Sequence, residues 1–146
     1  MKIFIGADHA GFQRKQKIIN YLQAKDYKVE DLGNTKFRAQ DDYPDYAQKV
    51  SAEVAKKPEE NRGILVCDSG VGMQIAANRN PKIRAVNAWH KKIAERSREH
   101  NNSNVLCLGA DYLSWLKTKA IINIWLETEF SEAKRHRRRV NKLNKK

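Results

Sequence analysis

Short apolar runs alternate with amphipathic stretches along most of the chain, and this alternation constrains the fold more than any other feature. Five apolar runs predict strands, at Lys2–Gly6, Lys28–Leu32, Gly63–Cys67, Arg84–Ala88 and Val105–Gly109. Six amphipathic segments predict helices, at Phe12–Ala24, Tyr46–Lys56, Val71–Arg79, Lys91–His100, Tyr112–Leu126 and Ser131–Lys142. Because such alternation forms right-handed βαβ units, we expect an α/β fold. It would be a Rossmann-like, doubly wound parallel sheet of about five strands in three αβα layers, with a C-terminal helix.

The length and composition are those of an ordinary folded protein. The 146 residues suffice for one core, so we expect a single domain over residues 1–146, ending in a basic helix or tail over about 131–146. No apolar run approaches the roughly 18 residues of a membrane span, and the chain turns polar at Asp8 before a signal peptide could develop. Cys67 and Cys107 lie too far apart for a CxxC pair. We therefore expect a cytoplasmic protein without disulfides or a membrane partner.

Positive charge is concentrated at the C-terminus. The formal net charge is +12, and residues 134–146 supply +8 of it through eight lysines and arginines with no acid. Such a run can be a nucleic-acid arm, a solvated helix end or a clamp for a small anion. No aromatic residue interleaves with the basic residues, so the stacking platform of single-strand binders is missing. A nucleic-acid partner is therefore disfavoured.

Three loops have a composition suited to chemistry. Ligands of doubly wound sheets bind outside the carboxyl ends of the strands, in the loops. The three loops are Gly6–Gly11 after the first predicted strand, Cys67–Gly72 after the third and Arg98–Asn104 before the fifth.

The Cys67–Gly72 segment is a glycine-rich turn between a predicted strand and a predicted helix. Backbone N–H groups at such a helix start can bind an anion or stabilise an oxyanion. The segment matches neither the GxxxxGK[ST] nor the GxGxxG pattern, so no nucleotide cofactor is indicated. The alternative is a tight turn in which Asp68 or Ser69 is an ordinary N-cap.

Cys67 ends the predicted strand at this turn. A helix N-terminus there would lower the pKa of its thiol and favour a thiolate that can act as a base. The alternative is a buried structural cysteine, which is the interpretation we give to Cys107.

The four histidines favour acid–base chemistry over a metal site. His9, His90, His100 and His136 show no metal-ligand spacing, so we expect no metal. Each alone could be structural. A thiol, a hydroxyl, an anion-binding turn, imidazoles and arginines that converge would form an acid–base site for a small phosphorylated substrate.

Several of these segments together resemble a known family. They are Gly6-Ala7-Asp8-His9-Ala10-Gly11-Phe12, Asp42-Tyr43-Pro44, and Gly63–Cys67 leading to Gly70-Val71-Gly72 and Ile75-Ala76-Ala77-Asn78. The later segments Ser97-Arg98-Glu99-His100-Asn101, Asn104-Val105-Leu106, Arg135-His136 and Arg139-Val140 follow in the family's order. The chain is similar over nearly its whole length to ribose-5-phosphate isomerase B and its galactose-6-phosphate isomerase relatives.

The resemblance implies a fold and an activity. The family has a Rossmann-like fold and is usually a homodimer with active sites between the subunits; a tetramer remains open. It interconverts aldose and ketose phosphates through a cis-enediolate and needs no cofactor. The implied reaction links ribose 5-phosphate and ribulose 5-phosphate in the non-oxidative pentose phosphate pathway.

The resemblance also implies a role for each candidate site residue. Cys67 would move the proton between C1 and C2, and Ser69 would assist the transfer between O1 and O2. The N–H groups of the turn, from Ser69 through Gly70, Val71 and Gly72 to Met73, would hold the enediolate. His100, helped by Asp8, would open the furanose ring. Asn101 and Tyr43 would orient the sugar, and His9, Arg135 and Arg139 would bind the phosphate.

Two positions depart from the family's pattern. Asp68 stands where the family commonly has glycine, within the substrate-binding turn, and a carboxylate beside Cys67 would raise the thiol pKa. The stretch Val86-Asn87-Ala88-Trp89-His90 is also unusual. Two alternatives stay open: an isomerase of a six-carbon aldose phosphate, such as allose or galactose 6-phosphate, and a sugar-phosphate-binding protein that has lost catalysis.

Overall fold

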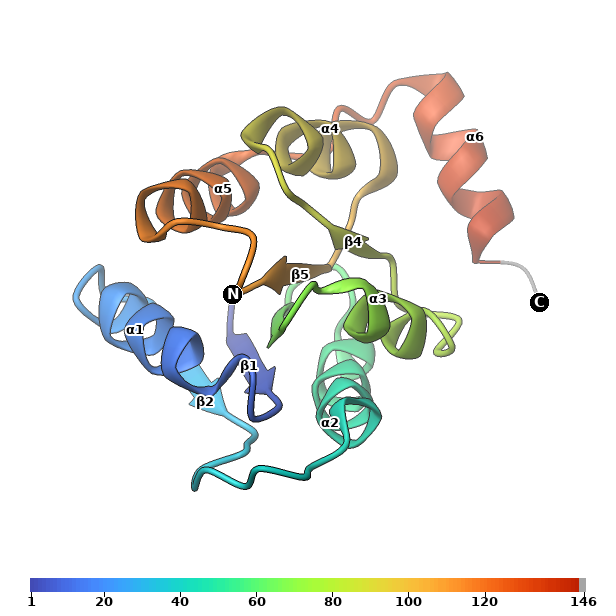
Figure 1. The fold of residues 1–146 in the computed structure, drawn as a ribbon. Helices are drawn as coiled ribbons and strands as arrows, with labels where there is room; N and C mark the ends of the chain where they lie inside the picture. Colours follow the sequence, from blue (N-terminus) through green and yellow to red (C-terminus); the bar gives the residue numbers. More distant parts are fainter. Residues whose placement is uncertain (145–146) are drawn as a thin grey trace.

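One parallel sheet organises the chain in the computed structural model, which describes residues 1–144 (Figure 1). The five strands lie in the order β2-β1-β3-β5-β4, and every neighbouring pair is parallel. Their bounds are β1 Ile3–Ala7, β2 Val29–Asp31, β3 Arg62–Cys67, β4 Ala85–Asn87 and β5 Val105–Gly109. The predicted doubly wound α/β sheet is confirmed.

Each predicted helix is present, with shifted ends. The bounds are α1 Phe12–Gln23, α2 Tyr43–Lys56, α3 Val71–Ala77, α4 Lys91–Asn101, α5 Trp115–Glu127 and α6 Lys134–Leu143. The predicted start of α2 at Tyr46 is wrong by three residues, because Pro44 fits the first turn of a helix. The predicted start of α5 at Tyr112 is also too early. Ser114 caps this helix by accepting a hydrogen bond from the Lys117 N–H at 3.2 Å.

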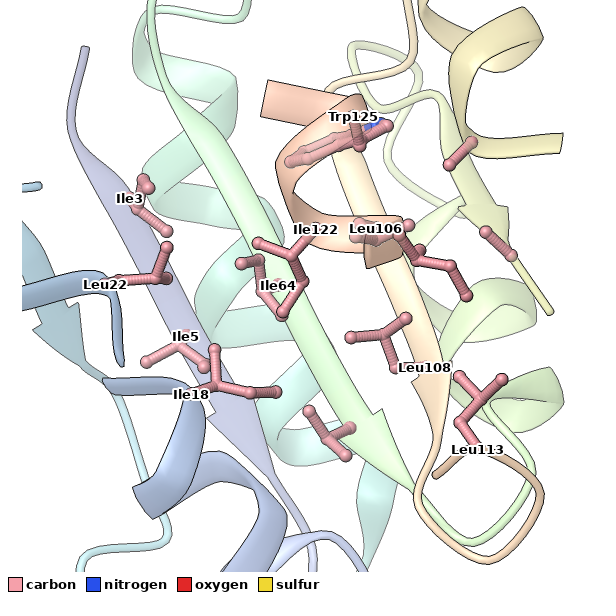
Figure 2. Packing of buried hydrophobic residues seen from close by; sticks show 14 of the residues in the cluster. Ile3, Ile5, Ile18, Leu22, Ile64, Leu106, Leu108, Leu113, Ile122 and Trp125 are labelled. Carbon is pink, nitrogen blue, oxygen red and sulfur yellow. The ribbon is translucent and has the colours of Figure 1, made fainter. Parts of the chain in front are cut away.

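The two faces of the sheet carry separate apolar clusters because side chains alternate along each strand. Ile64, Leu106 and Leu108 pack against α1 and α5 on one face, and Figure 2 shows this cluster. Leu65 and Cys67 point to the other face, where α2 and α3 cover them. The sheet is thus buried on both sides, and the free ends of its strands remain for a site.

The basic C-terminal segment forms α6, which packs against α4 at the outside of the fold (Figure 1). His136 and Val140, four residues apart, are its buried side chains. Most of its lysines and arginines are exposed, and Lys145 and Lys146 of the basic tail lie outside the described residues. Among the described helices, none is long and apolar enough to cross a bilayer.

Candidate active site

The carboxyl ends of β1 and β3 bring the first two predicted loops together. Ala7, the last residue of β1, pairs with Val66 of β3. The next residues, Asp8 and Cys67, therefore lie side by side at the carboxyl ends of these two adjacent strands. Asp8 is buried, and its Oδ1 accepts a hydrogen bond from the Gly11 N–H at 3.1 Å. Burial raises the pKa of the Asp8 carboxyl, against the effect of this hydrogen bond.

The Cys67 thiol is buried beside the start of α3. Its Sγ accepts a hydrogen bond from the Gly70 N–H at 3.1 Å. Burial nevertheless raises the pKa of the thiol, and the nearby Asp8 carboxylate raises it further, against the N–H groups of Gly70 and Met73. The backbone N–H groups at the helix start lower this pKa as expected, but desolvation and Asp8 outweigh them, so the expected net lowering of the thiol pKa is wrong.

Glycine shapes the turn after Cys67. Gly70, the N-cap of α3, has a φ of 81°, a left-handed conformation that other residues rarely adopt. Gly70 is the N-cap of α3, so the alternative in which Asp68 or Ser69 takes that position is wrong, although Ser69 Oγ accepts a hydrogen bond from the Val71 N–H at 3.4 Å. A Cβ on Gly72 would lie 2.8 Å from the ring of Tyr43, so the absence of a side chain there lets this ring lie against the turn.

Asp68 points toward a different partner from the one expected. Its side chain is exposed, and its backbone carbonyl oxygen accepts a hydrogen bond from the Asp111 N–H at 3.2 Å. The interaction with the Asp111 carboxyl raises the pKa of Asp68. The carboxylate that raises the pKa of Cys67 is Asp8. The expectation that Asp68 perturbs the thiol is thus corrected.

Asp41, which sequence reasoning missed, holds His9. Asp41 Oδ1 lies 2.9 Å from the His9 N–H and 2.8 Å from the ring Nδ1, and the Asn34 amide donates to Oδ2. The hydrogen bond to Asp41 raises the pKa of His9. Although burial opposes it, hydrogen bonds from His9, Tyr46 and Asn34 lower the pKa of Asp41. The pair therefore favours a protonated imidazole, which suits an anionic group of a ligand.

Asp41→Asn should weaken the binding of an anionic substrate by His9 above neutral pH. The raised pKa of His9 keeps its charge above the ordinary value of 6.5, and the charged pair is lost as the pH rises through that raised pKa. Without the carboxylate, His9 should lose its proton at lower pH. At pH 8 we expect KM to rise by about three- to tenfold with little change in kcat.

NMR titration of His9 and KM as a function of pH would check this expectation. Asp42→Asn is the matched control, because Asp42 is the neighbouring acid and makes no side-chain cap hydrogen bond. Equal KM profiles for both variants would contradict the role of Asp41.

The remaining predicted residues gather at the opposite edge of the sheet. α4 begins beyond the carboxyl end of β4 and ends just before β5 starts. Because Ala85 of β4 pairs in parallel with Val105 of β5, α4 returns the chain to the amino edge. There Asn101 lines a cavity of about 440 Å³. His100 thus lies near the amino ends of the strands, whereas Cys67 lies at the carboxyl ends.

α6 adds its arginines beside His100. The ring centroids of His100 and His136 are 4.4 Å apart, so His136 joins the end of α4 to α6. Arg135 Nε donates to His136 Nε2 at 3.3 Å, and burial, His100 and the neighbouring arginines lower the pKa of His136. Arg135 and Arg139 therefore belong to the His100 group, and within one chain this group does not meet Cys67.

Arg98 anchors the end of α4. Its buried guanidinium donates to the Ser103 carbonyl, to the Asn102 side chain at 2.8 Å and to the Thr128 carbonyl at 3.2 Å. Burial, with repulsion from Arg62 and Arg84, lowers the pKa of Arg98 to about 10. This contact network fixes the place of His100 two residues later.

The described part of the chain holds no group of three or more histidine, cysteine or acidic side chains that could bind a metal. The groups at the carboxyl edge are a buried thiol, a buried carboxyl, a glycine turn and an imidazole paired with a carboxylate. Such groups can carry out proton transfer on a small anionic substrate.

Comparisons with known proteins agree with this class of site. A family model described as Ribose/Galactose Isomerase matches residues 3–143. The chain belongs to this family and is an isomerase.

Relatives with solved structures include ribose-5-phosphate isomerases of type B. The structure from Mycoplasma genitalium with bound ribulose 5-phosphate is 38% identical, with a TM-score of 0.95 over 98% of this chain and 93% of that one. The Clostridium thermocellum structure is 40% identical, with a TM-score of 0.92 over 99% and 95%. Ribose-5-phosphate isomerase B of Mycobacterium tuberculosis is 36% identical over 98% of this chain and 88% of its own length.

Proposed function

We propose that this protein interconverts ribose 5-phosphate and ribulose 5-phosphate. The observation that carries the proposal is the group of Cys67, Asp8 and the glycine turn at the carboxyl edge of the sheet. This arrangement lies in a chain that superposes with a TM-score of 0.95 on an isomerase with ribulose 5-phosphate bound.

Cys67 is the base in this proposal. Its thiolate takes the proton from C2 of the open-chain aldose, and the electron pair of the C–H bond moves to give the enediolate. The S–H then returns the proton to C1, while Ser69 assists the transfer of the hydroxyl proton between O1 and O2. The raised pKa makes the thiolate scarcer at neutral pH but a stronger base.

The turn after Cys67 binds the enediolate. The N–H groups from Ser69 through Gly70, Val71 and Gly72 to Met73 supply donors at the start of α3. Asp68 contributes to substrate binding at the exposed rim of the turn, and Tyr43 orients the sugar from the start of α2.

Ring opening and phosphate binding need a second copy of the chain. His100, with Asp8, opens the furanose ring, Asn101 orients the sugar, and Arg135 and Arg139 join His9 on the phosphate. His100 and the arginines lie at the edge opposite to Cys67, so they reach the site from the second subunit of a homodimer. Val71 and Ile75, four residues apart on α3, are 50% and 57% exposed and offer an apolar contact beside the turn.

A panel of aldose phosphates tests the proposed function. Purified protein should form ribulose 5-phosphate from ribose 5-phosphate faster than ketoses from allose or galactose 6-phosphate. A preference for a six-carbon substrate would instead make the protein an isomerase of allose or galactose 6-phosphate. Binding of all three without turnover would contradict the reaction.

A further inference from the structure

Asn87 contacts the turn after Cys67 from a different strand. It ends β4, and its side-chain Nδ2 donates to the carbonyl oxygen of Ser69 at 3.1 Å. This hydrogen bond joins the edge strand of the sheet to the segment that carries the proposed enediolate donors. Neither the proposed reaction nor phosphate binding requires Asn87 itself.

The carbonyl of Ser69 and the N–H of Gly70 belong to one peptide group. A peptide group is planar, and in the trans form its C=O and N–H point in opposite directions. The N–H side of this group donates to Cys67 Sγ at 3.1 Å, and the C=O side accepts from Asn87. A side chain that fixes the oxygen therefore also fixes the direction of the N–H.

A contact from outside the turn can keep this peptide group from rotating. Gly70 has a φ of 81°, and turns that contain a left-handed glycine can interconvert by rotation of the preceding peptide group. The surroundings are close: a Cβ on Gly109 would lie 2.8 Å from the Ser69 oxygen, and a Cβ on Gly70 would lie 2.5 Å from Asn87 Oδ1. Asn87 thus packs directly on this peptide group and bonds to its oxygen.

We propose that Asn87 is a positioning residue, which holds the Gly70 N–H against Cys67 Sγ through the Ser69–Gly70 peptide group so that the thiolate forms with a donor in place. The inference deepens the proposed function and rests on it, since it gives Asn87 a role in a reaction whose base is Cys67. Asn87 acts through the peptide group and does not touch the reacting atoms.

Asn87→Leu tests the inference, because leucine has the same branched shape, cannot donate and excludes water from the Ser69 oxygen. The pKa of the Cys67 thiol is measured from the rate of alkylation by iodoacetamide against pH, with the Cys67 peptide followed by mass spectrometry. We expect this pKa to rise by about one pH unit, so that alkylation at neutral pH slows about tenfold. The amide resonance of Gly70 should shift as its hydrogen bond weakens.

Asn87→Ala covers the case in which the leucine variant fails to fold. It leaves room for a water molecule that can donate to Ser69, so we expect a smaller rise of the thiol pKa in the same direction.

The matched control is Asn78→Ala. Asn78 also bonds the end of α3 to β4, through the N–H and C=O of Ala85, but does not bond to the Cys67 turn. This variant should lose stability and keep the wild-type thiol pKa.

A thiol pKa in the folded Asn87 variants equal to that of the wild type would overturn the inference, whatever happens to turnover. A rise that Asn78→Ala reproduces would overturn it too, since the effect would then come from general loosening of α3. If the thiol pKa rises in the Asn87 variants alone while the pH profile of kcat/KM does not move, Asn87 positions the donor as proposed and Cys67 as the base is refuted.

Discussion

A mixture of Cys67→Ala and His100→Ala subunits should recover about a quarter of the wild-type activity, although each variant alone is nearly inactive. The reason is that the two side chains lie at opposite edges of the sheet within one chain. In the proposed homodimer, a mixed dimer joins an intact Cys67 edge to an intact His100 edge at one site and both defects at the other. With random exchange, about half of the dimers are mixed, and each has one working site of two.

The experiment uses equal amounts of the two variants, co-expressed so that subunits mix, and compares kcat with that of the wild type. Cys67→Ala mixed with Ser69→Ala is the matched control. Both of those defects lie at the same edge, so every site keeps one of them and kcat per site should stay at the mean of the two parent variants. No recovery in the Cys67/His100 mixture would contradict the shared site.

Cys67→Ala alone should lower kcat by about 10³-fold or more while KM changes little. The thiol is the proposed base for the proton on C2, whereas His9 and the two α6 arginines are the proposed phosphate ligands. Loss of the base therefore removes the chemical step and leaves the ground-state contacts in place. Ribose 5-phosphate binding by calorimetry and turnover by ketose formation would measure the two effects separately.

The kcat of the wild type should rise with pH if the Cys67 thiolate is the base. Burial and Asp8 raise the pKa of the Cys67 thiol above its ordinary value of 9.0, so the thiolate fraction grows with pH across the neutral range. The rate kcat should accordingly rise by about tenfold per pH unit on the limb below this pKa.

Cys107→Ala is the control for both measurements. Cys107 is fully buried in β5, and its removal should lower the stability without changing kcat or the pH profile. Substantial turnover by Cys67→Ala, or a flat pH profile, would contradict Cys67 as the base.

The order of strands and helices could be predicted because it depends on local periodicity. Runs such as Val105–Gly109 are apolar at every position, since both faces of their strands are covered, and this pattern is visible without the fold. The turn after Cys67 could be predicted for the same reason, because its glycines and its position between a strand and a helix are visible in the local sequence.

The contacts that decide pKa values could not be predicted, because they join distant parts of the chain. His9 and Asp41 are 32 residues apart, and nothing near Asp41 marks it as the partner of an imidazole. Asp8 and Cys67 meet through the pairing of β1 with β3. Asp68, adjacent in sequence to Cys67, instead turns toward Asp111 in the loop after β5.

Arg98 fixes the position of the end of α4 through contacts that do not depend on the protonation of their oxygen partners. Its guanidinium holds the end of α4 through carbonyl and amide oxygens, none of which titrates, and it stays protonated up to a pKa of about 10. At the other edge, the charges of His9 and Cys67 depend on pH: the hydrogen bond to Asp41 raises the pKa of His9, and burial raises the pKa of the Cys67 thiol. Within one chain, contacts that do not titrate thus hold the end of α4 at the amino edge, whereas the groups that exchange protons in the proposed reaction lie at the carboxyl edge.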